Sequence, residues 1–305
     1  MMKKILFATD GSGPAQLAAE FLAHLPHNEA MDVTVVSVLF VPGSREAYFV
    51  EDWVETSLAE ERARFDEAFA KVESVFAGAN VQLQQIVREG HAGETIVAVA
   101  KEIQPELLVI GATGHSAISR ILLGSTSDYV ATHACCSVLV VRPTGIFEGQ
   151  RPLHVAIAYE ETGPAEAAVE EFAEFDWGKE TEVQLVSATN YPGAHDVPEE
   201  ARSYHAVNEA VKKLQATAPR VRGKTIHGDH IGETLVKFTE ANDVDLMVVG
   251  EANRSRLSRV LMGSITRFVL RHASCSVWIT RNQMVRGLSA EEAASDSHKH
   301  KTQSS

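Results

Sequence analysis

The sequence lacks the features of several protein classes. Only three of its 305 residues are cysteines, Cys135, Cys136 and Cys275, and their spacing fits neither a disulfide framework nor a zinc site. All three adjoin apolar runs, so we expect buried thiols in a reducing cytoplasm. No apolar run is long enough for a membrane-spanning helix. The run that follows the first lysines is also too short for the core of a signal peptide.

Positive charge is scarce as well. The chain has 28 Lys and Arg against 41 Asp and Glu, which gives a formal net charge of −13 at pH 7. Nucleic acids and anionic membranes bind clustered cations, so we expect neither as a partner. Hydrophobic residues make up 45% of the chain, which is enough for two domains of average size, each with an ordinary core.

The sequence does contain an internal duplication. The tripeptide Gly13-Pro14-Ala15 recurs 150 residues later as Gly-Pro-Ala from Gly163, within a longer similar stretch. The pentapeptide HAGET from His91 recurs 139 residues later as HIGET, so the second copy has lost about eleven residues in its middle. This period is far too long for a solenoid. We therefore interpret the chain as two copies of one domain.

The boundary between the copies is marked by composition. The stretch Pro143–Pro152 carries two prolines and two glycines, as is typical of a linker. The residues after 282 include no aromatic side chain, which favours disorder. We place the parts of the chain as follows: domain 1 at residues 1–143, a linker at 144–152, domain 2 at 153–282 and a disordered tail at 283–305.

Each copy alternates short apolar strands with amphipathic helices. The strands read as nearly continuous apolar runs, for example LLVIG at Leu107–Gly111. Such runs are typical of parallel sheets that helices cover on both faces. The sequence therefore predicts an α/β fold with an open, doubly wound, parallel five-stranded sheet in each copy. Ligands of such sheets bind beyond the carboxyl ends of the strands.

One glycine-rich stretch lies between two of these strands in domain 1. Gly111 ends a buried strand, Gly114 follows it, and Gly124 leads into the next helix with hydroxyl-bearing residues at 125–127. Glycine lets the backbone approach a ligand without a Cβ in the way. The first amides of a helix have no internal partner and carry the positive end of its dipole. The stretch therefore predicts a phosphate-binding cradle.

With this glycine spacing, closed by Gly124 and Ser125, the chain resembles the ATP-binding branch of the universal stress protein family in its tandem two-domain form. The segments ATDGS at Ala8–Ser12 and HACCSVLVVR at His133–Arg142 are also similar to family features, although Ser137 replaces a usual proline. The resemblance covers both copies. It implies a Rossmann-like fold, as in adenine nucleotide alpha hydrolases, and an adenine nucleotide (ATP, ADP or AMP) in domain 1. A Mg²⁺ or Mn²⁺ ion could bridge the phosphates with few protein ligands.

The resemblance gives each candidate residue a role. Asp10, at the tip of the first strand, would lie beside the adenine or ribose, and the backbone of Val38 would meet the adenine edge. The glycine loop and the helix after it would hold the ribose and phosphates. His115, inside that loop, would either reach a phosphate or remain an exposed loop residue. The candidate nucleotide-binding residues are Thr9, Asp10, Val38, Gly111, Gly114, His115, Gly124, Ser125, Thr126 and Ser127.

Domain 2 departs from this pattern. Glu160 and Glu161 take the places of Asp10 and Gly11, and Asn253 replaces the second loop glycine. Added negative charge and bulk near the phosphates disfavour a triphosphate in a partly desolvated site. We expect a weakened or empty nucleotide site in domain 2.

Other functions lack their motifs. Gly11-Ser12-Gly13 follows a strand, but the third glycine and the acidic ribose ligand of a dinucleotide site are missing. The sequence also contains no P-loop, nucleophile elbow, defensible carboxylate pair or set of metal ligands. We therefore favour a cytoplasmic, nucleotide-gated stress-response module that binds or signals to an unknown protein partner. A slow ATPase and a nucleotide-independent interaction scaffold are the alternatives.

The resemblance also implies an assembly. The family commonly pairs domains through their last strands, which here are Ser137–Val141 and Ser276–Thr280. Pairing within one chain would form a pseudo-twofold dimer and cover two exposed sheet edges. A homodimer of the whole chain is compatible with the sequence but is not specified by it.

Overall fold

The structure, a computed structural model, describes residues 4–25, 30–40, 51–114, 123–146, 151–175, 177–190, 197–251 and 262–281, with the backbone alone at 51–57 and 197–200. Three sequence-based expectations concern positions outside these ranges: the loop histidine His115, the substitution Asn253 and the tail at 283–305.

Domain 1 alternates strands and helices in the predicted order. Its elements are β1 (Lys4–Ala8), α1 (Gly13–His24), β2 (Met31–Leu39), α2 (Glu51–Val75), β3 (Val81–Glu89), α3 (Ala92–Ile103), β4 (Leu107–Gly111), α4 (Ser125–His133) and β5 (Ser137–Val141).

Domain 2 repeats this order. Its elements are β6 (His154–Ala158), α5 (Gly163–Phe172), β7 (Glu182–Thr189), α6 (Val197–Leu214), β8 (Arg220–His227), α7 (Ile231–Ala241), β9 (Leu246–Gly250), α8 (Ser264–His272) and β10 (Ser276–Thr280). The missing residues fall between β7 and β8, where α6 has 18 residues and its counterpart α2 has 25.

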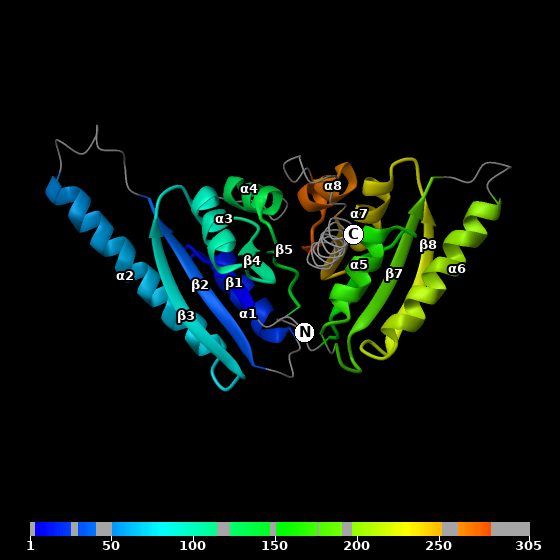
Figure 1. The fold of residues 1–305 in the computed structure, drawn as a ribbon, viewed down its shortest axis with the longest axis horizontal. Helices are drawn as coiled ribbons and strands as arrows, with labels where there is room; N and C mark the ends of the chain where they lie inside the picture. The colour runs from blue at the N-terminus through cyan, green and yellow to red at the C-terminus, as the bar shows by residue number, and fades with distance from the viewer. Residues whose placement is uncertain are drawn as a thin grey trace, which may run out of the picture.

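The strands form one continuous ten-stranded sheet in the order β3-β2-β1-β4-β5-β10-β9-β6-β7-β8. Neighbours within each half are parallel, whereas β5 and β10 pair antiparallel through the register Val277 with Val140 and Ile279 with Val138. The two halves meet through these strands at the centre of Figure 1. This arrangement confirms the predicted pairing of the last strands within one chain.

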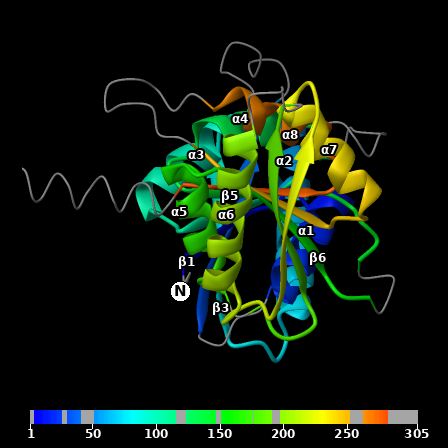
Figure 2. The same ribbon diagram turned by 90° about the vertical axis from the view of Figure 1, so that its right-hand side faces the viewer.

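Helices cover both faces of the sheet because successive side chains of each strand point to opposite faces. In β1, Ile5 and Phe7 belong to one buried cluster, and Leu6 and Ala8 belong to the other. Figure 2 shows α5 and α6 on one side of the domain 2 strands and α7 on the other. In the described ranges, no helix is long and apolar enough to cross a bilayer.

A buried ion pair reinforces the junction between the halves. Arg281, directly after β10, donates from Nε to Glu251 Oε2 at 2.5 Å. It also crosses to domain 1, where Nη2 donates to the carbonyl of Ala131 at 2.5 Å and Nη1 to the carbonyls of Ala134 and Cys136 at 3.2 and 3.3 Å. The carbonyl of Ala131 lies in the last turn of α4 and the other two follow the helix, where the helix dipole is negative and favours a cation.

The expectation of three buried thiols is wrong for one of them. Cys136 and Cys275 are buried, but Cys135 is exposed. The chain turns between the end of α4 and the start of β5, and domain 2 has the exposed Ser274 at the equivalent position. A hydrogen bond with Cys136 lowers the pKa of the Cys135 thiol to about 6, whereas burial raises the pKa of Cys275 to about 11.

Candidate functional site

A cavity of about 260 Å³ opens at the carboxyl ends of β1 and β4 in domain 1. At this point the order of the strands reverses, because β2 lies on one side of β1 and β4 on the other. Doubly wound sheets bind ligands at this switch point. The cavity is lined by every candidate residue within the described ranges, namely Thr9, Asp10, Val38, Gly111, Gly114, Gly124, Ser125, Thr126 and Ser127.

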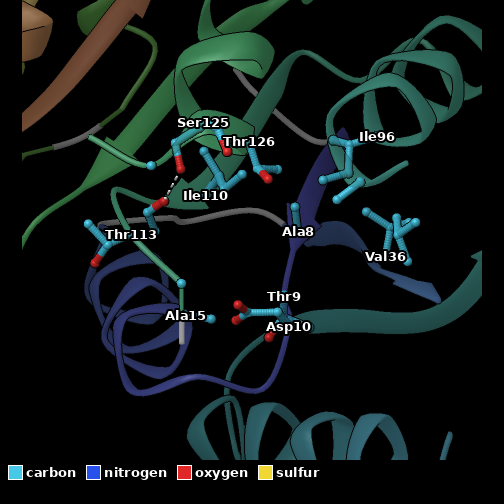
Figure 3. A pocket seen from close by; sticks show the side chains of 16 residues that line it. Ala8, Thr9, Asp10, Ala15, Val36, Ile96, Ile110, Thr113, Ser125 and Thr126 are labelled. Carbon is cyan, nitrogen blue, oxygen red and sulfur yellow. Dashed lines mark hydrogen bonds between the residues drawn. The ribbon is translucent and has the colours of Figure 1, made fainter. Parts of the chain in front are cut away.

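The turn from β1 to α1 fixes Asp10 at the cavity. The Thr9 hydroxyl oxygen accepts a hydrogen bond from the amide of Gly11 at 3.1 Å, and Asp10 Oδ1 accepts one from the amide of Ser12 at 3.0 Å. Gly11 has a φ of +75°, which favours glycine. In Figure 3 the carboxylate of Asp10 points toward the loop that carries Thr113. The turn thus orients the carboxylate of Asp10, a hydrogen-bond acceptor, toward the cavity.

Gly114 allows this carboxylate to lie against the glycine loop. A Cβ at Gly114 would stand 2.6 Å from Asp10 Oδ2, closer than real Cβ atoms approach. Any other residue would therefore displace Asp10 or move the loop. Domain 2 changes both members of this contact, since it has Glu160 and Asn253 at the equivalent positions.

Gly111 has a different role from the one inferred from its spacing. A Cβ there would lie 2.9 Å from the carbonyl oxygen of Pro14, at the start of α1. Gly250 in domain 2 faces the carbonyl of Pro164 in the same way. This glycine recurs because α1 and α5 pack closely on the neighbouring strand. Its backbone borders the cavity. A side chain at this position would meet α1 and would not fill the space of a ligand.

The amino end of α4 lies on the opposite side of the cavity from Asp10, with Ser125 and Thr126 at its start (Figure 3). Gly124 is the N-cap residue, and no side chain caps the helix. Ser127, expected to donate to a phosphate, instead donates its hydroxyl hydrogen to the carbonyl of Gly111 at 2.7 Å. Ser127 thus anchors the helix to β4, while the uncapped first-turn amides face the cavity region.

Asp128, the acidic residue in the first turn of α4, forms an ion pair with an arginine of domain 2. Arg271, on α8, donates to both carboxylate oxygens of Asp128, with Nη2 to Oδ2 at 3.0 Å and Nε to Oδ1 at 3.2 Å. An unpaired carboxylate at this place would repel an anion bound at the helix start. The contact between the domains therefore favours anion binding in domain 1.

An apolar wall completes the cavity, and the sequence interpretation named only its residue Val38. Val36 and Val38 share one face of β2, and Ala92 and Ile96 face them from α3. The alternation along β2 could have indicated Val36. The contribution of α3 could not be read, because it depends on how that helix packs. The other missed lining residues are Ala8, Ala15, Ile110 and Thr113.

An exposed aromatic residue lies just past this wall. Phe40 follows β2 on the same face as Val38 and is 55% exposed. Its ring centroid lies 5.5 Å from that of His91, which precedes α3. The rim beside the apolar wall therefore carries two flat side chains.

Among the described residues, no positively charged side chain lines the cavity. Its lining in these ranges includes Asp10 and several hydroxyl groups but neither lysine nor arginine. Nor does the described part of the chain bring together three or more metal-ligating His, Cys, Asp or Glu side chains. An anionic ligand here would depend on backbone amides, hydroxyl groups and the dipole of α4.

The equivalent turn in domain 2 has a different backbone. Among the described non-glycine residues, positive φ values occur at Gln104 and Asp243 only, so Glu161 does not reproduce the conformation of Gly11. The amide of Thr162 donates to the carbonyl of Glu160 at 2.6 Å. The side chain of Thr162, the N-cap residue of α5, makes no capping hydrogen bond to the helix. The turn that orients Asp10 in domain 1 is therefore absent from domain 2.

Comparison with known proteins agrees with this duplicated architecture. The profile of the universal stress protein family matches residues 1–142 and again residues 154–281. The chain belongs to the universal stress protein family. It is similar to a universal stress protein of Mycobacterium tuberculosis, with 27% identity over 284 residues, which cover 92% of this chain and 97% of the relative. A universal stress protein of Methanocaldococcus jannaschii is 31% identical over 150 residues, covering 47% of this chain and 83% of the relative.

Solved structures of universal stress proteins share the fold along most of the chain. A universal stress protein from Archaeoglobus fulgidus aligns with a TM-score of 0.61 at 16% identity, covering 91% of this chain and 95% of that one. A putative universal stress protein from Pseudomonas aeruginosa aligns with a TM-score of 0.57 at 16% identity, covering 92% and 93%. At these identities the similarity establishes the fold.

Proposed function

We propose that this universal stress protein binds an adenine nucleotide, preferably ATP, in domain 1 and acts as a nucleotide-gated stress-response module. The observation that carries the proposal is the convergence of four features at one cavity. These features are the oriented carboxylate of Asp10, the glycine loop, the uncapped start of α4 and the apolar wall of β2 and α3. Together they match the base, ribose and phosphate parts of a nucleotide.

Each part of the nucleotide has a suited surface. Val36 and Val38 suit the faces and edge of an adenine ring, which is flat and mostly apolar. Asp10 supplies an acceptor for ribose hydroxyls or for the exocyclic amino group. The amides at the start of α4 and the hydroxyls of Ser125 and Thr126 suit the phosphates. His115, in the loop after Gly114, is proposed as a further phosphate contact.

A divalent cation fits this site as a partner of the nucleotide. The described lining has no basic side chain and a single carboxylate, so the protein alone neutralises little of a triphosphate's charge. Mg²⁺ commonly retains several waters and binds through substrate phosphates with few protein ligands. We propose that Mg²⁺ or Mn²⁺ bridges the phosphate oxygens when ATP is bound.

Domain 2 is proposed to be a weak or empty site that stabilises domain 1. Its first turn lacks the Asp10 geometry, and Glu160 and Glu161 are exposed where the nucleotide would lie. Its residue Arg271 instead offsets the charge of Asp128 beside the domain 1 cavity. In this proposal domain 1 binds the nucleotide, and domain 2 stabilises the nucleotide site of domain 1.

Replacing Asp10 with alanine should weaken ATP binding by about tenfold to a hundredfold, because one or two hydrogen bonds to a carboxylate would be lost. The fold should be unaffected, since Asp10 is exposed and its bond to the amide of Ser12 lies within the local turn between β1 and α1. Glu160→Ala, the equivalent change in domain 2, is the matched control and should leave the affinity unchanged. The measurement is isothermal titration with ATP and Mg²⁺. Equal affinities for the wild type and Asp10→Ala would contradict the assignment of Asp10.

A further inference from the structure

Arg142, directly after β5, is buried at the junction of the two domains with few partners. It is 2% exposed. Its Nη2 donates to the carbonyl of Leu270 in α8 at 2.7 Å, but neither Nε nor Nη1 has an acceptor among the described residues. A guanidinium stays protonated in proteins. A full positive charge therefore lies away from water, and two of its donor atoms have no acceptor in the part of the chain that the structure describes.

The pseudo-symmetry of the chain shows what Arg142 lacks. Arg281 is its equivalent in domain 2, and each arginine reaches the carboxyl end of the last helix in the other domain. Arg281 also has a carboxylate partner, Glu251. The residue of domain 1 equivalent to Glu251 is Ala112. Of the two equivalent buried arginines, Arg142 thus has alanine at the position where Arg281 has its carboxylate partner.

The two positions have the same backbone setting. The amide of Ala112 donates to the carbonyl of Val141 at 2.8 Å, and the amide of Glu251 donates to that of Thr280 at 3.2 Å. Each residue therefore lies beside the strand end that precedes its arginine. Alanine is smaller than glutamate by one methylene and a carboxylate group, and Ala112 is itself buried, at 3% exposed.

Other groups near Arg142 do not balance its charge. Burial raises the pKa of the neighbouring Cys275 thiol to about 11, so the thiol is neutral at pH 7. Asp245 is already bound by Arg151, with oxygen to nitrogen distances of 2.6 and 2.7 Å. The carboxyl end of α8 contributes a partial charge only. In accordance with this imbalance, burial lowers the pKa of Arg142 from its ordinary value.

We propose that Arg142 binds a small monovalent anion, chloride under cellular conditions, beside Ala112 in the place that the Glu251 carboxylate takes in domain 2. A halide carries the same charge as a carboxylate, accepts hydrogen bonds from several directions and needs no further donors from the chain. The burial of both Arg142 and Ala112 excludes larger anions such as a nucleotide. The bound ion would join the end of β5 in domain 1 to α8 of domain 2.

Thermal unfolding at constant ionic strength tests the proposal. Ions that bind the native state alone raise its stability, so the full chain should unfold about 3 °C higher in sodium chloride or bromide than in sodium gluconate. Ala112→Glu should remove the difference, because it supplies the missing carboxylate. Glu251→Ala should enlarge the difference, because it creates a second arginine without a counter-charge. Arg142→Met should abolish the difference.

Crystals soaked in bromide locate the ion directly. The proposal requires an anomalous peak within hydrogen-bonding distance of Arg142 Nε or Nη1 in the wild type and no such peak in Ala112→Glu. Equal unfolding temperatures of the wild type in chloride and gluconate would overturn it. So would a halide effect that persists in Ala112→Glu, a comparison that holds even if Arg142→Met fails to fold.

Discussion

Replacing Gly114 with valine is expected to lower the affinity for ATP by about a hundredfold or more, equal to about 2.7 kcal/mol of binding free energy. Even the first carbon of the new side chain would stand 2.6 Å from Asp10 Oδ2. Asp10 would therefore leave its position, and the valine methyl groups would enter the cavity. The free energy of unfolding should change by about 1 kcal/mol or less, because no core packing is involved.

Gly124→Val is expected to have a similar effect on binding from the other side of the cavity. A Cβ at Gly124 would lie 3.3 Å from the carbonyl oxygen of Ala112 and 3.6 Å from Thr113 Cα. The loop would have to move away from the start of α4, and the amides of its first turn would lose their alignment toward the phosphates.

Domain 2 supplies the matched control for both variants. A Cβ at Gly263, the equivalent of Gly124, would have only Thr266 Oγ1 nearby, at 3.8 Å. Gly263→Val should therefore leave the fold intact and ATP affinity unchanged. Titration calorimetry of the three variants beside the wild type makes the comparison. Equal loss of affinity in Gly263→Val would show that the effect is not specific to the domain 1 cavity.

Replacing Arg281 with methionine is expected to lower the free energy of unfolding by about 3–5 kcal/mol. The arginine is 6% exposed and Glu251 is 4% exposed, so the change would leave a carboxylate buried without its partner. Three carbonyls at and after the carboxyl end of α4 would lose their donor as well. Urea unfolding followed by circular dichroism measures the change.

The double variant Arg281→Met with Glu251→Met separates the cost of the unpaired charge from the loss of packing. Removing both charges at once leaves no buried ion, and replacement of whole buried pairs by apolar residues is often nearly neutral. The double variant should therefore recover most of the stability that the single variant loses. Equal losses in both variants would mean that the carbonyl contacts, rather than the ion pair, determine the stability of the junction.

The fold could be predicted from the sequence because its signals are local. Apolar runs such as Leu107–Gly111, the proline at the start of α1 and the repeated HAGET motif each depend on a few neighbouring residues. The pairing of β5 with β10 followed from the family resemblance and from the need to cover two sheet edges. All of these elements occur in the structure.

The roles of individual site residues were less predictable, because they depend on contacts between distant segments. Nothing in the spacing of Gly111 indicates that it packs against the carbonyl of Pro14 at the start of α1, or that Ser127 donates to a backbone carbonyl. The contribution of Ile96 to the cavity depends on the packing of α3. The contrast between Arg142 and Arg281 became visible only when the buried hydrogen-bond partners of both arginines were known.

The number of adenine nucleotides bound per chain tests the central claim most directly. Native mass spectrometry of the full chain, titrated with ATP and Mg²⁺, counts them without any assumption about affinity. At an ATP concentration that just saturates the wild type, we expect one ATP per wild-type chain and almost none in Gly114→Val. An absence of bound nucleotide in the wild type at saturating ATP, or a single site that survives unchanged in Gly114→Val, would contradict a nucleotide site in domain 1.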